Sequence, residues 1–180
     1  YRRFFKFDKI APTIDITTPT TTAPNNIGGN ALAIISGTAN DTGGGGLEYV
    51  EFSLRYDDSS KRWQHYVSSG EWVASANDIW NRAYPQAANW SVWTSSNIGF
   101  VESQSYVFAV RTRDLATNLS NEKSISFNYD IAAPTSKITS PAAGAFTSRV
   151  ATISGTVEDQ ISTGTASGLD VDFRVAIKRL

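Results

Sequence analysis

The hydrophobic and polar positions of this chain alternate in several short stretches, and a period of two residues predicts half-buried β-strands. The stretches with this pattern are residues 14–17, 49–55, 106–112 and 123–129, and residues 31–38 form a more continuously apolar stretch. Two of them place their apolar side chains on one face, and these side chains are Val50, Phe52, Leu54, Tyr106, Phe108 and Val110. We expect these six side chains to be buried in an all-β domain.

Turn-forming residues separate the predicted strands, and they lie at residues 24–26, 43–46, 57–60 and 114–121. Short strands punctuated by Gly, Asp and Asn are typical of a β-sandwich or barrel. Residues 57–100 form one enlarged region between strands, which carries all five Trp and, at residues 77–82, a predicted helical turn. Aromatic residues make up 12% of the chain, and such residues favour strands over helices.

The chain matches itself at three places in the same order. Residues 5–13 match residues 127–135, so that Asp8 corresponds to Asp130 at an offset of 122 residues. Residues 35–41 match residues 153–159 at an offset of 118. The third match joins residues 50–52 to residues 171–173 at an offset of 121. Ordered matches of this kind predict tandem structural units.

These matches divide the chain into three parts. Residues 1–7 correspond to the last strand of a preceding unit, residues 8–129 to one complete unit with a Trp-rich insertion, and residues 130–180 to the first part of another. We therefore expect the chain to be a segment of a tandem array. The chain contains no Met and begins with Tyr1, which agrees with that expectation.

Three motifs follow one another along the complete unit. The first is Asp8-x-x-Ala11-Pro12-Thr13, and the second is Ile35-Ser36-Gly37-Thr38-Ala39-x-Asp41, followed by glycines and by Val50-x-Phe52-Ser53-Leu54. The third is Tyr106-x-Phe108-x-Val110-Arg111-x-Arg113-Asp114-x-Ala116-x-Asn118. This order resembles the bacterial immunoglobulin-like repeats of very long surface adhesins and extracellular fibres. The resemblance covers residues 8–129 and, less completely, residues 130–173. It implies tandem immunoglobulin-like β-sandwiches, the first complete and the second truncated. The family commonly has Gly where this chain has Thr117, at a position suited to positive φ.

Acidic residues occupy three loops that such a sandwich brings to one pole, because its strands alternate in direction. Asp8 precedes the first strand, Asp41 follows the second, and Asp114 and Asn118 follow the sixth. Calcium binds about six to eight oxygen ligands of these kinds, and related adhesin repeats often hold calcium at domain joints. The alternative is that these side chains only cap turns.

The second joint repeats part of this set. Asp130 and Asp159 correspond to Asp8 and Asp41, so the same two interpretations apply to them. Because turn geometry repeats together with the sequence, the recurrence of these residues does not choose between calcium binding and turn capping.

The composition excludes several classes of function. The chain has no Cys, which removes disulfides, thiolate zinc sites and cysteine nucleophiles. Its single His, His65, rules out a multi-histidine metal site and has no partner in any catalytic motif. The formal net charge of -1 argues against nucleic-acid binding. Residues 43–46 are not a phosphate-binding loop, because no Lys-Ser/Thr follows. Asp57 and Asp58 are more typical of a solvated loop than of a glycosidase pair, so we predict no enzyme activity.

The five Trp allow two interpretations, and they are Trp63, Trp72, Trp80, Trp90 and Trp93. They fill the core of the enlarged unit, as large aromatic side chains commonly do, or several of them form a flat exposed platform that stacks on sugars. A coplanar exposed pair of rings distinguishes the second interpretation from the first.

The main functional hypothesis is a non-catalytic structural or adhesive segment of an extracellular multidomain stalk or fibre, secreted or at the cell surface. Its expected partners are neighbouring repeats of the same chain, other copies in a fibre, or a surface glycan, and neither nucleic acid nor a membrane is expected. The first alternative is a carbohydrate-binding accessory module of a large secreted enzyme. The second is a filament subunit whose residues 1–7 add a strand to a neighbouring chain.

Overall fold

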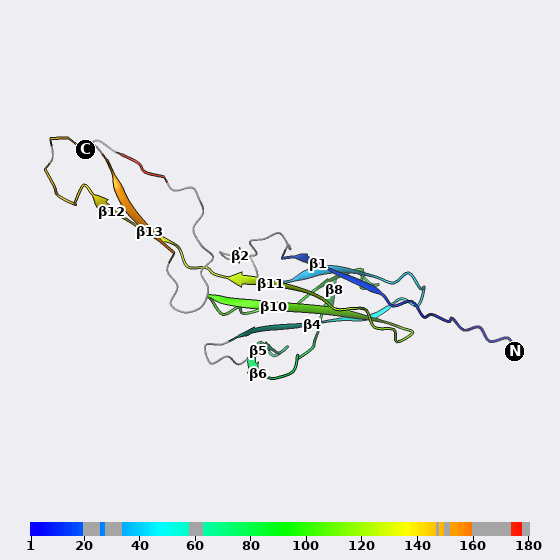
Figure 1. Ribbon diagram of the computed structural model, residues 1–180. Coiled ribbons are helices and arrows are strands. Elements are labelled where there is room, and N and C mark those ends of the chain that lie inside the picture. Colours follow the sequence, from blue (N-terminus) through cyan, green and yellow to red (C-terminus); the bar gives the residue numbers. More distant parts are fainter. Residues whose placement is uncertain are drawn as a thin grey trace.

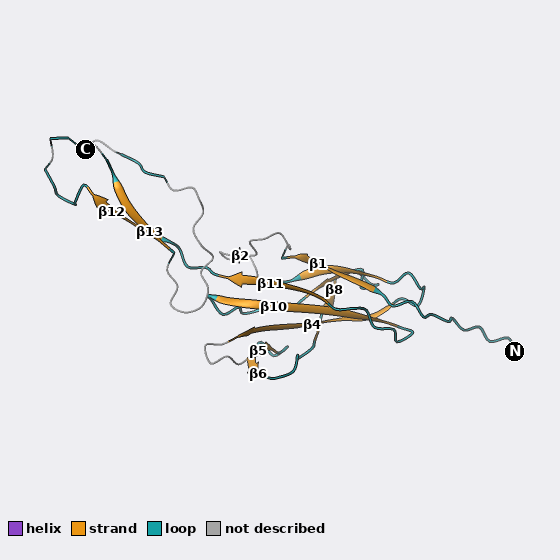
Figure 2. Ribbon diagram, in the orientation of Figure 1, coloured by secondary structure: helices purple, strands orange, loops and turns teal. Residues whose placement is uncertain are grey.

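The computed structural model describes residues 1–19, 26–27, 34–57, 63–146, 148–149, 152–159 and 174–177. Every regular element in these residues is a β-strand, which confirms the predicted all-β class (Figure 2). The strands are β1 (Thr13–Thr18), β2 (Asn26–Ile27), β3 (Ser36–Asn40), β4 (Leu47–Asp57), β5 (Trp63–Tyr66), β6 (Trp72–Ala74), β7 (Asn81–Arg82), β8 (Tyr84–Pro85), β9 (Val92–Thr94), β10 (Gln104–Asp114), β11 (Lys123–Tyr129), β12 (Thr135–Ser140) and β13 (Ser154–Glu158). Within this part of the chain, no helix has the length and apolar character needed to cross a membrane.

Strands β1 to β11 form two sheets that pack face to face as a β-sandwich (Figure 1). Sheet 1 has the order β1-β3-β9-β8, and all of its strand pairs are antiparallel. Sheet 2 has the order β2-β11-β10-β4-β5-β6, and β7 also pairs with β4. The pairing of the short strand β2 with β11 is parallel.

The core lies between the two sheets and contains the side chains that the alternation predicts. Side chains of β4 and β10 at alternate positions are fully buried there, and they are Val50, Phe52, Leu54, Tyr106, Phe108 and Val110. From sheet 1, Trp93 stacks on Phe108 with ring centroids 6.2 Å apart, and this contact joins the two sheets. Burial of each such side chain stabilises the fold by about 1.5–3 kcal/mol.

One buried hydroxyl fixes the loop that leads into β10. The Tyr106 hydroxyl donates to the Val101 carbonyl oxygen at 2.9 Å and accepts from the Val101 backbone nitrogen at 2.7 Å. Burial raises the pKa of Tyr106 far above its ordinary value. The hydroxyl therefore stays protonated and keeps both hydrogen bonds.

The β12–β13 pair repeats the β1–β3 pair in register. In the first pair Thr13 lies opposite Asn40, and a register shift separates Ile16 from Thr18. In the second pair Thr135 lies opposite Glu158, and the same shift separates Ile138 from Ser140. The residues of β1 and β12 are related by the sequence offset of 122, and those of β3 and β13 by the offset of 118.

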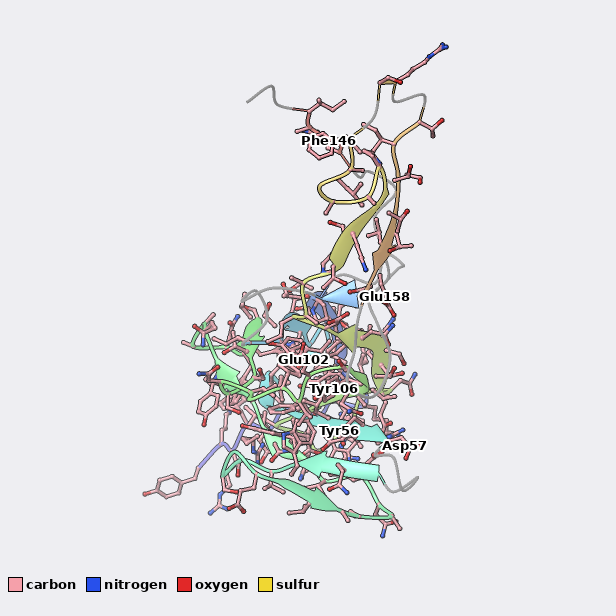
Figure 3. All side chains as sticks on the ribbon, turned by 90° about the vertical axis from the view of Figure 1, so that its left-hand side faces the viewer. Tyr56, Asp57, Glu102, Tyr106, Phe146 and Glu158 are labelled. Atoms are coloured by element: carbon pink, nitrogen blue, oxygen red, sulfur yellow. The ribbon has the colours of Figure 1, made fainter. Side chains whose placement is uncertain are left out.

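The two pairs differ in what covers them. Ile16 is buried in the sandwich core, whereas its counterpart Ile138 is 61% exposed. The β12–β13 pair projects from one end of the sandwich (Figure 1), and Figure 3 shows Phe146 at its far end. Residues 1–7 extend from the opposite end, are largely exposed and form no strand.

The structure corrects one prediction for residues 57–100, and it supports core packing for some of the Trp residues. Residues 77–82 contain no helical turn, because Asn81 and Arg82 pair with β4 as strand β7. Among the Trp side chains that the structure describes, only Trp93 is fully buried in the core. Trp72 and Trp90 pack against the core as half-buried rings, and Trp80 contacts Arg111 instead. The side chain of Trp63 lies outside the described residues.

Candidate metal centre

Three aspartates from distant parts of the sequence converge at the end of the sandwich from which residues 1–7 extend (Figure 1). Asp8 precedes β1, Asp41 follows β3, and Asp114 is the last residue of β10. One carboxylate oxygen from each lies within 4.8 Å of the other two. The structure therefore brings together the three carboxylates of the predicted first joint.

The loop after β3 holds the carboxylates of Asp8 and Asp41 through backbone nitrogens. Asp8 accepts hydrogen bonds from Ile10 and Gly45, both at 2.9 Å. Asp41 accepts from Gly43 at 2.9 Å and from Gly46 at 2.6 Å. Each aspartate therefore caps a turn, as one of the two interpretations predicts, and the capped turns place the carboxylates side by side.

Glycine at two positions of this loop permits the close approach. A Cβ at Gly45 would lie 2.8 Å from Asp8 Oδ2, and a Cβ at Gly43 would overlap the same carboxylate. The sequence pattern of residues 43–46 predicts only a turn. The run of glycines beside an acidic residue was the available signal that a charged group lies against this backbone.

Asp114 and Asn118 close the third side of the cluster. Asp114 is completely buried, and it accepts from the Asn118 backbone nitrogen and from Asn118 Nδ2, both at 2.8 Å. Asn118 Nδ2 also donates to the Asp8 carbonyl oxygen at 3.3 Å. Thr117 takes φ 76°, a left-handed conformation that favours Gly, so the positive φ expected at this position is present. In this arrangement Asn118 faces the cluster with its nitrogen, and it would offer an oxygen only after its amide turned over.

The chemistry of the cluster suits a hard cation. Three neighbouring carboxylates repel one another, and no ion pair among the described residues involves Asp8, Asp41 or Asp114. Each carboxylate oxygen that accepts one hydrogen bond keeps a second lone pair for a ligand. Oxygen donors without nitrogen or sulfur favour calcium or magnesium over zinc.

At the predicted second joint the structure describes only part of the corresponding set of residues. Asp130 is buried and accepts from the Ala132 backbone nitrogen at 2.9 Å, as Asp8 accepts from Ile10. Asp159 follows β13 directly, as Asp41 follows β3. The counterpart of the glycine loop falls within residues 160–173, outside the described residues. Among the described residues, neither Asp130 nor Asp159 belongs to a group of three side chains that could hold a metal ion.

His65 lies far from this cluster and has partners that the sequence did not reveal. It is 2% exposed, and its Nδ1 lies 3.9 Å from Asp78 Oδ1. Arg55 forms an ion pair with the same oxygen of Asp78. No sequence motif links His65 to Asp78, because a turn between β6 and β7 brings them together.

The described Trp rings do not form a flat sugar-binding surface. Trp72 meets Tyr56 and Tyr66 edge to face and donates from Nε1 to the Gly99 carbonyl oxygen. The Trp80 ring faces the Arg111 guanidinium at 3.8 Å. None of the ring contacts among the described side chains joins two Trp.

No family model, curated protein or solved structure matches the chain.

Proposed function

We propose that the chain is a non-catalytic segment of an extracellular stalk or fibre, built from tandem immunoglobulin-like domains that are secreted or held at the cell surface. The observation that carries this proposal is the shared register of the β1–β3 and β12–β13 pairs. In the two strand pairs, corresponding residues face each other and the register shifts at the corresponding position. This correspondence supports a second unit of the same kind. A rod of stacked units is the simplest assembly of such a chain.

The strand order of the sandwich supports the immunoglobulin-like assignment. Sheet 1 has the order β1-β3-β9-β8, which corresponds to the immunoglobulin order A-B-E-D. In sheet 2, β11, β10, β4, β5 and β6 correspond to strands G, F, C, C′ and C″ of the variable type. The hydrogen bonds between Tyr106 and Val101 correspond to the tyrosine corner at the start of strand F.

Packing takes over the role that a disulfide has in many such domains. The chain has no Cys, and Trp93 on β9 stacks on Phe108 of β10 at the centre of the sandwich. Because an aromatic core needs no oxidising compartment to form, this arrangement suits a domain whose stability rests on packing.

The joints between units are short and constrained. Between Asp8 and the first residue of β1 stand only four residues, of which Pro12 is buried. Pro134 has the corresponding position at the second joint. Proline restricts the backbone of a linker, and Asp8 is itself held by the Gly45 nitrogen. These contacts favour a stiff array over flexibly tethered domains.

We propose that calcium binds among Asp8, Asp41 and Asp114 and stiffens the first joint. The cation would offset the repulsion among three carboxylates and would tie the linker to two loops. Asp130 and Asp159 have the corresponding role at the second joint. The proposed partners are neighbouring repeats and other copies of the fibre or a surface glycan.

Limited trypsin digestion tests the proposal, because Lys6 and Lys9 lie on either side of Asp8. Cleavage after these lysines should be slow in calcium and fast in chelator, and the Asp41→Ala variant should be cleaved fast in both. Asp57→Ala, which removes an exposed carboxylate elsewhere, is the matched control and should behave as the unmodified chain. Small-angle X-ray scattering should show a longer, stiffer particle in calcium. Equal cleavage and equal scattering in both buffers would contradict the stiff-joint proposal.

The two alternative functions, a carbohydrate-binding module and a filament subunit, are tested differently. A carbohydrate-binding module needs an exposed platform of rings, and the described Trp contacts do not favour one. A filament subunit needs residues 1–7 to be available, and they form no strand in this structure. Concentration-dependent assembly that is lost on removal of these residues would support the filament alternative over the single-chain stalk.

A further inference from the structure

The chain contains three Asn-x-Ser/Thr sequons, which begin at Asn40, Asn89 and Asn118. A sequon is the acceptor sequence for an N-linked glycan when its middle residue is not Pro. Because a transferase recognises both the asparagine and the hydroxyl two residues later, both groups must be accessible. The structure places the three sequons in different surroundings, so they differ in what a transferase can reach.

The sequon at Asn118 is closed at both recognised positions. Asn118 Nδ2 donates to Asp114 Oδ2 at 2.8 Å and to the Asp8 carbonyl oxygen at 3.3 Å. Ser120 is 6% exposed, and its hydroxyl accepts from the Thr112 backbone nitrogen at 2.9 Å. Neither group can meet a transferase while the loop after β10 stays folded.

The sequon at Asn40 has exposed side chains at both recognised positions but a fixed backbone. Asn40 is the last residue of β3 and pairs with Thr13 of β1, whose hydroxyl donates to the Asn40 carbonyl oxygen at 3.2 Å. The middle residue, Asp41, accepts from the backbone nitrogens of Gly43 and Gly46. A transferase would have to break these contacts to draw Asn40 into its catalytic site.

The sequon at Asn89 lies in the loop that joins β8 to β9, outside the paired residues of both strands. Asn89 is exposed, and its Oδ1 accepts from the Ser91 backbone nitrogen at 3.2 Å. This contact is an Asx-turn, in which the side chain fixes the backbone two residues later. It uses the amide oxygen and leaves Nδ2, the atom to which a glycan is attached, unoccupied by any hydrogen bond within the described structure.

Trp90, the middle residue of this sequon, anchors the loop. Its side chain packs against the hydrophobic core, and its backbone nitrogen donates to the Ala87 carbonyl oxygen at 3.0 Å. Trp90 takes φ 64°, and the Ser91 carbonyl oxygen accepts from the Ala39 backbone nitrogen at 3.2 Å. The bulky ring therefore lies against the protein, while Asn89 stays exposed on a preformed turn.

We propose that Asn89 accepts an N-linked glycan in the folded chain, and that Asn40 and Asn118 do not. The donor is a sugar activated by a diphosphate, which is carried on a lipid or on a nucleotide. Asn89 Nδ2 forms a bond to the anomeric carbon of the sugar. The bond between that carbon and the diphosphate oxygen breaks, the diphosphate leaves with the electron pair, and a base of the transferase takes the proton lost from Nδ2. This modification depends neither on calcium nor on fibre assembly.

A glycan at this position would stand beside the edge of sheet 1. Strand β8 is the last strand of that sheet, and Tyr84 on β8 is 53% exposed. Edge strands offer unpaired backbone groups to other chains. A hydrated glycan in the adjoining loop would keep such chains away from β8.

Enzymatic glycosylation of the whole folded chain tests the proposal. One arm uses a single-subunit oligosaccharyltransferase with a lipid-linked oligosaccharide, and the other uses a soluble N-glycosyltransferase with a nucleotide-activated glucose. Trypsin then separates the three sequons, because Asn40, Asn89 and Asn118 lie in the peptides 10–55, 83–111 and 114–123. Mass spectrometry should find one glycan on peptide 83–111 and none on the other two. The arm that yields this product identifies the carrier of the donor sugar.

Asn89→Gln should lose the mass shift completely, and Ser91→Ala should lose it as well because the recognised hydroxyl is absent. Ser91→Thr restores a hydroxyl at this position and should retain the mass shift. Asn40→Gln is the matched control, since it removes another exposed sequon asparagine, and it should leave the mass shift unchanged.

A folded chain that carries the glycan at Asn40 or Asn118 as readily as at Asn89 would overturn the proposal. A mass shift that persists in Asn89→Gln would overturn it too. A chain left unmodified in both arms would also contradict it, and modification of a free peptide of residues 86–94 in the same reactions would then show that the fold hides Asn89.

Discussion

The indole ring of Trp93 occupies the space that a side chain at Gly37 would need. The two residues are cross-strand partners on β9 and β3, and a Cβ at Gly37 would lie 2.6 Å from Trp93 Cε2. It would lie closer still to the Asp15 carbonyl oxygen of β1. The central ring of the sandwich therefore depends on glycine in the neighbouring strand.

Gly37→Ala should destabilise the sandwich, because neither the Trp93 ring nor the β1 backbone can withdraw without disturbing the core. Overpacking of this kind costs about 1–3 kcal/mol, measurable as a lower free energy of unfolding in urea. Gly99→Ala is the matched control, since a Cβ there meets nothing within 4 Å. A Gly37→Ala variant as stable as Gly99→Ala would show that the Trp93 ring is not held against β3.

Tyr106→Phe should lower the free energy of unfolding by about 1–3 kcal/mol, because the Val101 backbone groups lose their buried partner. Tyr84→Phe removes an exposed hydroxyl and should change stability very little. Thermal melting of both variants checks the prediction. Similar melting temperatures for the two would mean that water replaces the Tyr106 hydroxyl.

Calcium should raise the melting temperature of the sandwich through Asp8, Asp41 and Asp114. At 100 times the dissociation constant, mass action stabilises the bound state by about 2.7 kcal/mol. Asp41→Ala should abolish this response at the first joint, and Asp159→Ala should abolish it at the second. Calorimetric scans in calcium and in chelator measure the effect.

Turn capping alone predicts a different result for the same variants. Each Ala substitution would then cost about 1 kcal/mol, as a lost cap does, with or without calcium. A melting curve unaffected by calcium across the millimolar range would leave the aspartates as caps of their loops.

Stability should fall in mild acid because of His65. Its pKa is lowered in the folded chain, mainly by burial, so the unfolded state binds the proton more readily. The stabilising contribution is complete above about pH 6.5 and is lost as the pH falls through the lowered folded value. Urea unfolding should show this loss in the unmodified chain, while His65→Gln should be less sensitive to pH. An equal loss in both would assign the acid effect to carboxylates.

The strands with regular alternation were predictable from the sequence. The bounds of β11 agree residue for residue, and β4 and β10 extend the predicted stretches at both ends. Because only one face of each of these strands is buried, apolar and polar residues alternate along it, and this alternation predicts the strand. Of the apolar stretch at residues 31–38, the structure begins β3 only at Ser36, and residues 31–33 lie outside the described part of the chain.

The region between β4 and β10 was not predictable in the same way. Its strands have only two to four residues, too few for a period to appear, and their pairing depends on distant partners. Asn81 illustrates this dependence, because its Nδ2 donates to the Tyr66 carbonyl oxygen at 2.9 Å and so holds β7 beside β5. No local signal in residues 77–82 favoured a strand over a helical turn.

The acidic residues of the candidate metal centre were predictable from the sequence, but the contacts of the glycine loop with them were not. Alternating strand directions were enough to bring Asp8, Asp41 and Asp114 to one pole. The contacts of Gly43 and Gly45 with Asp8 depend on the path of the loop backbone, which sequence spacing does not determine.

The parallel pairing of β2 with β11 has a mechanical consequence. These strands lie near the start and the end of the unit, and Asn26 and Ile27 pair with Asn128 and Tyr129. A force that stretches the chain pulls two such parallel strands in opposite directions along their length. Their hydrogen bonds are then loaded together in shear, whereas a hairpin pulled at its open end breaks one bond after another. A sandwich joined in this way resists extension until both of these residue pairs separate together.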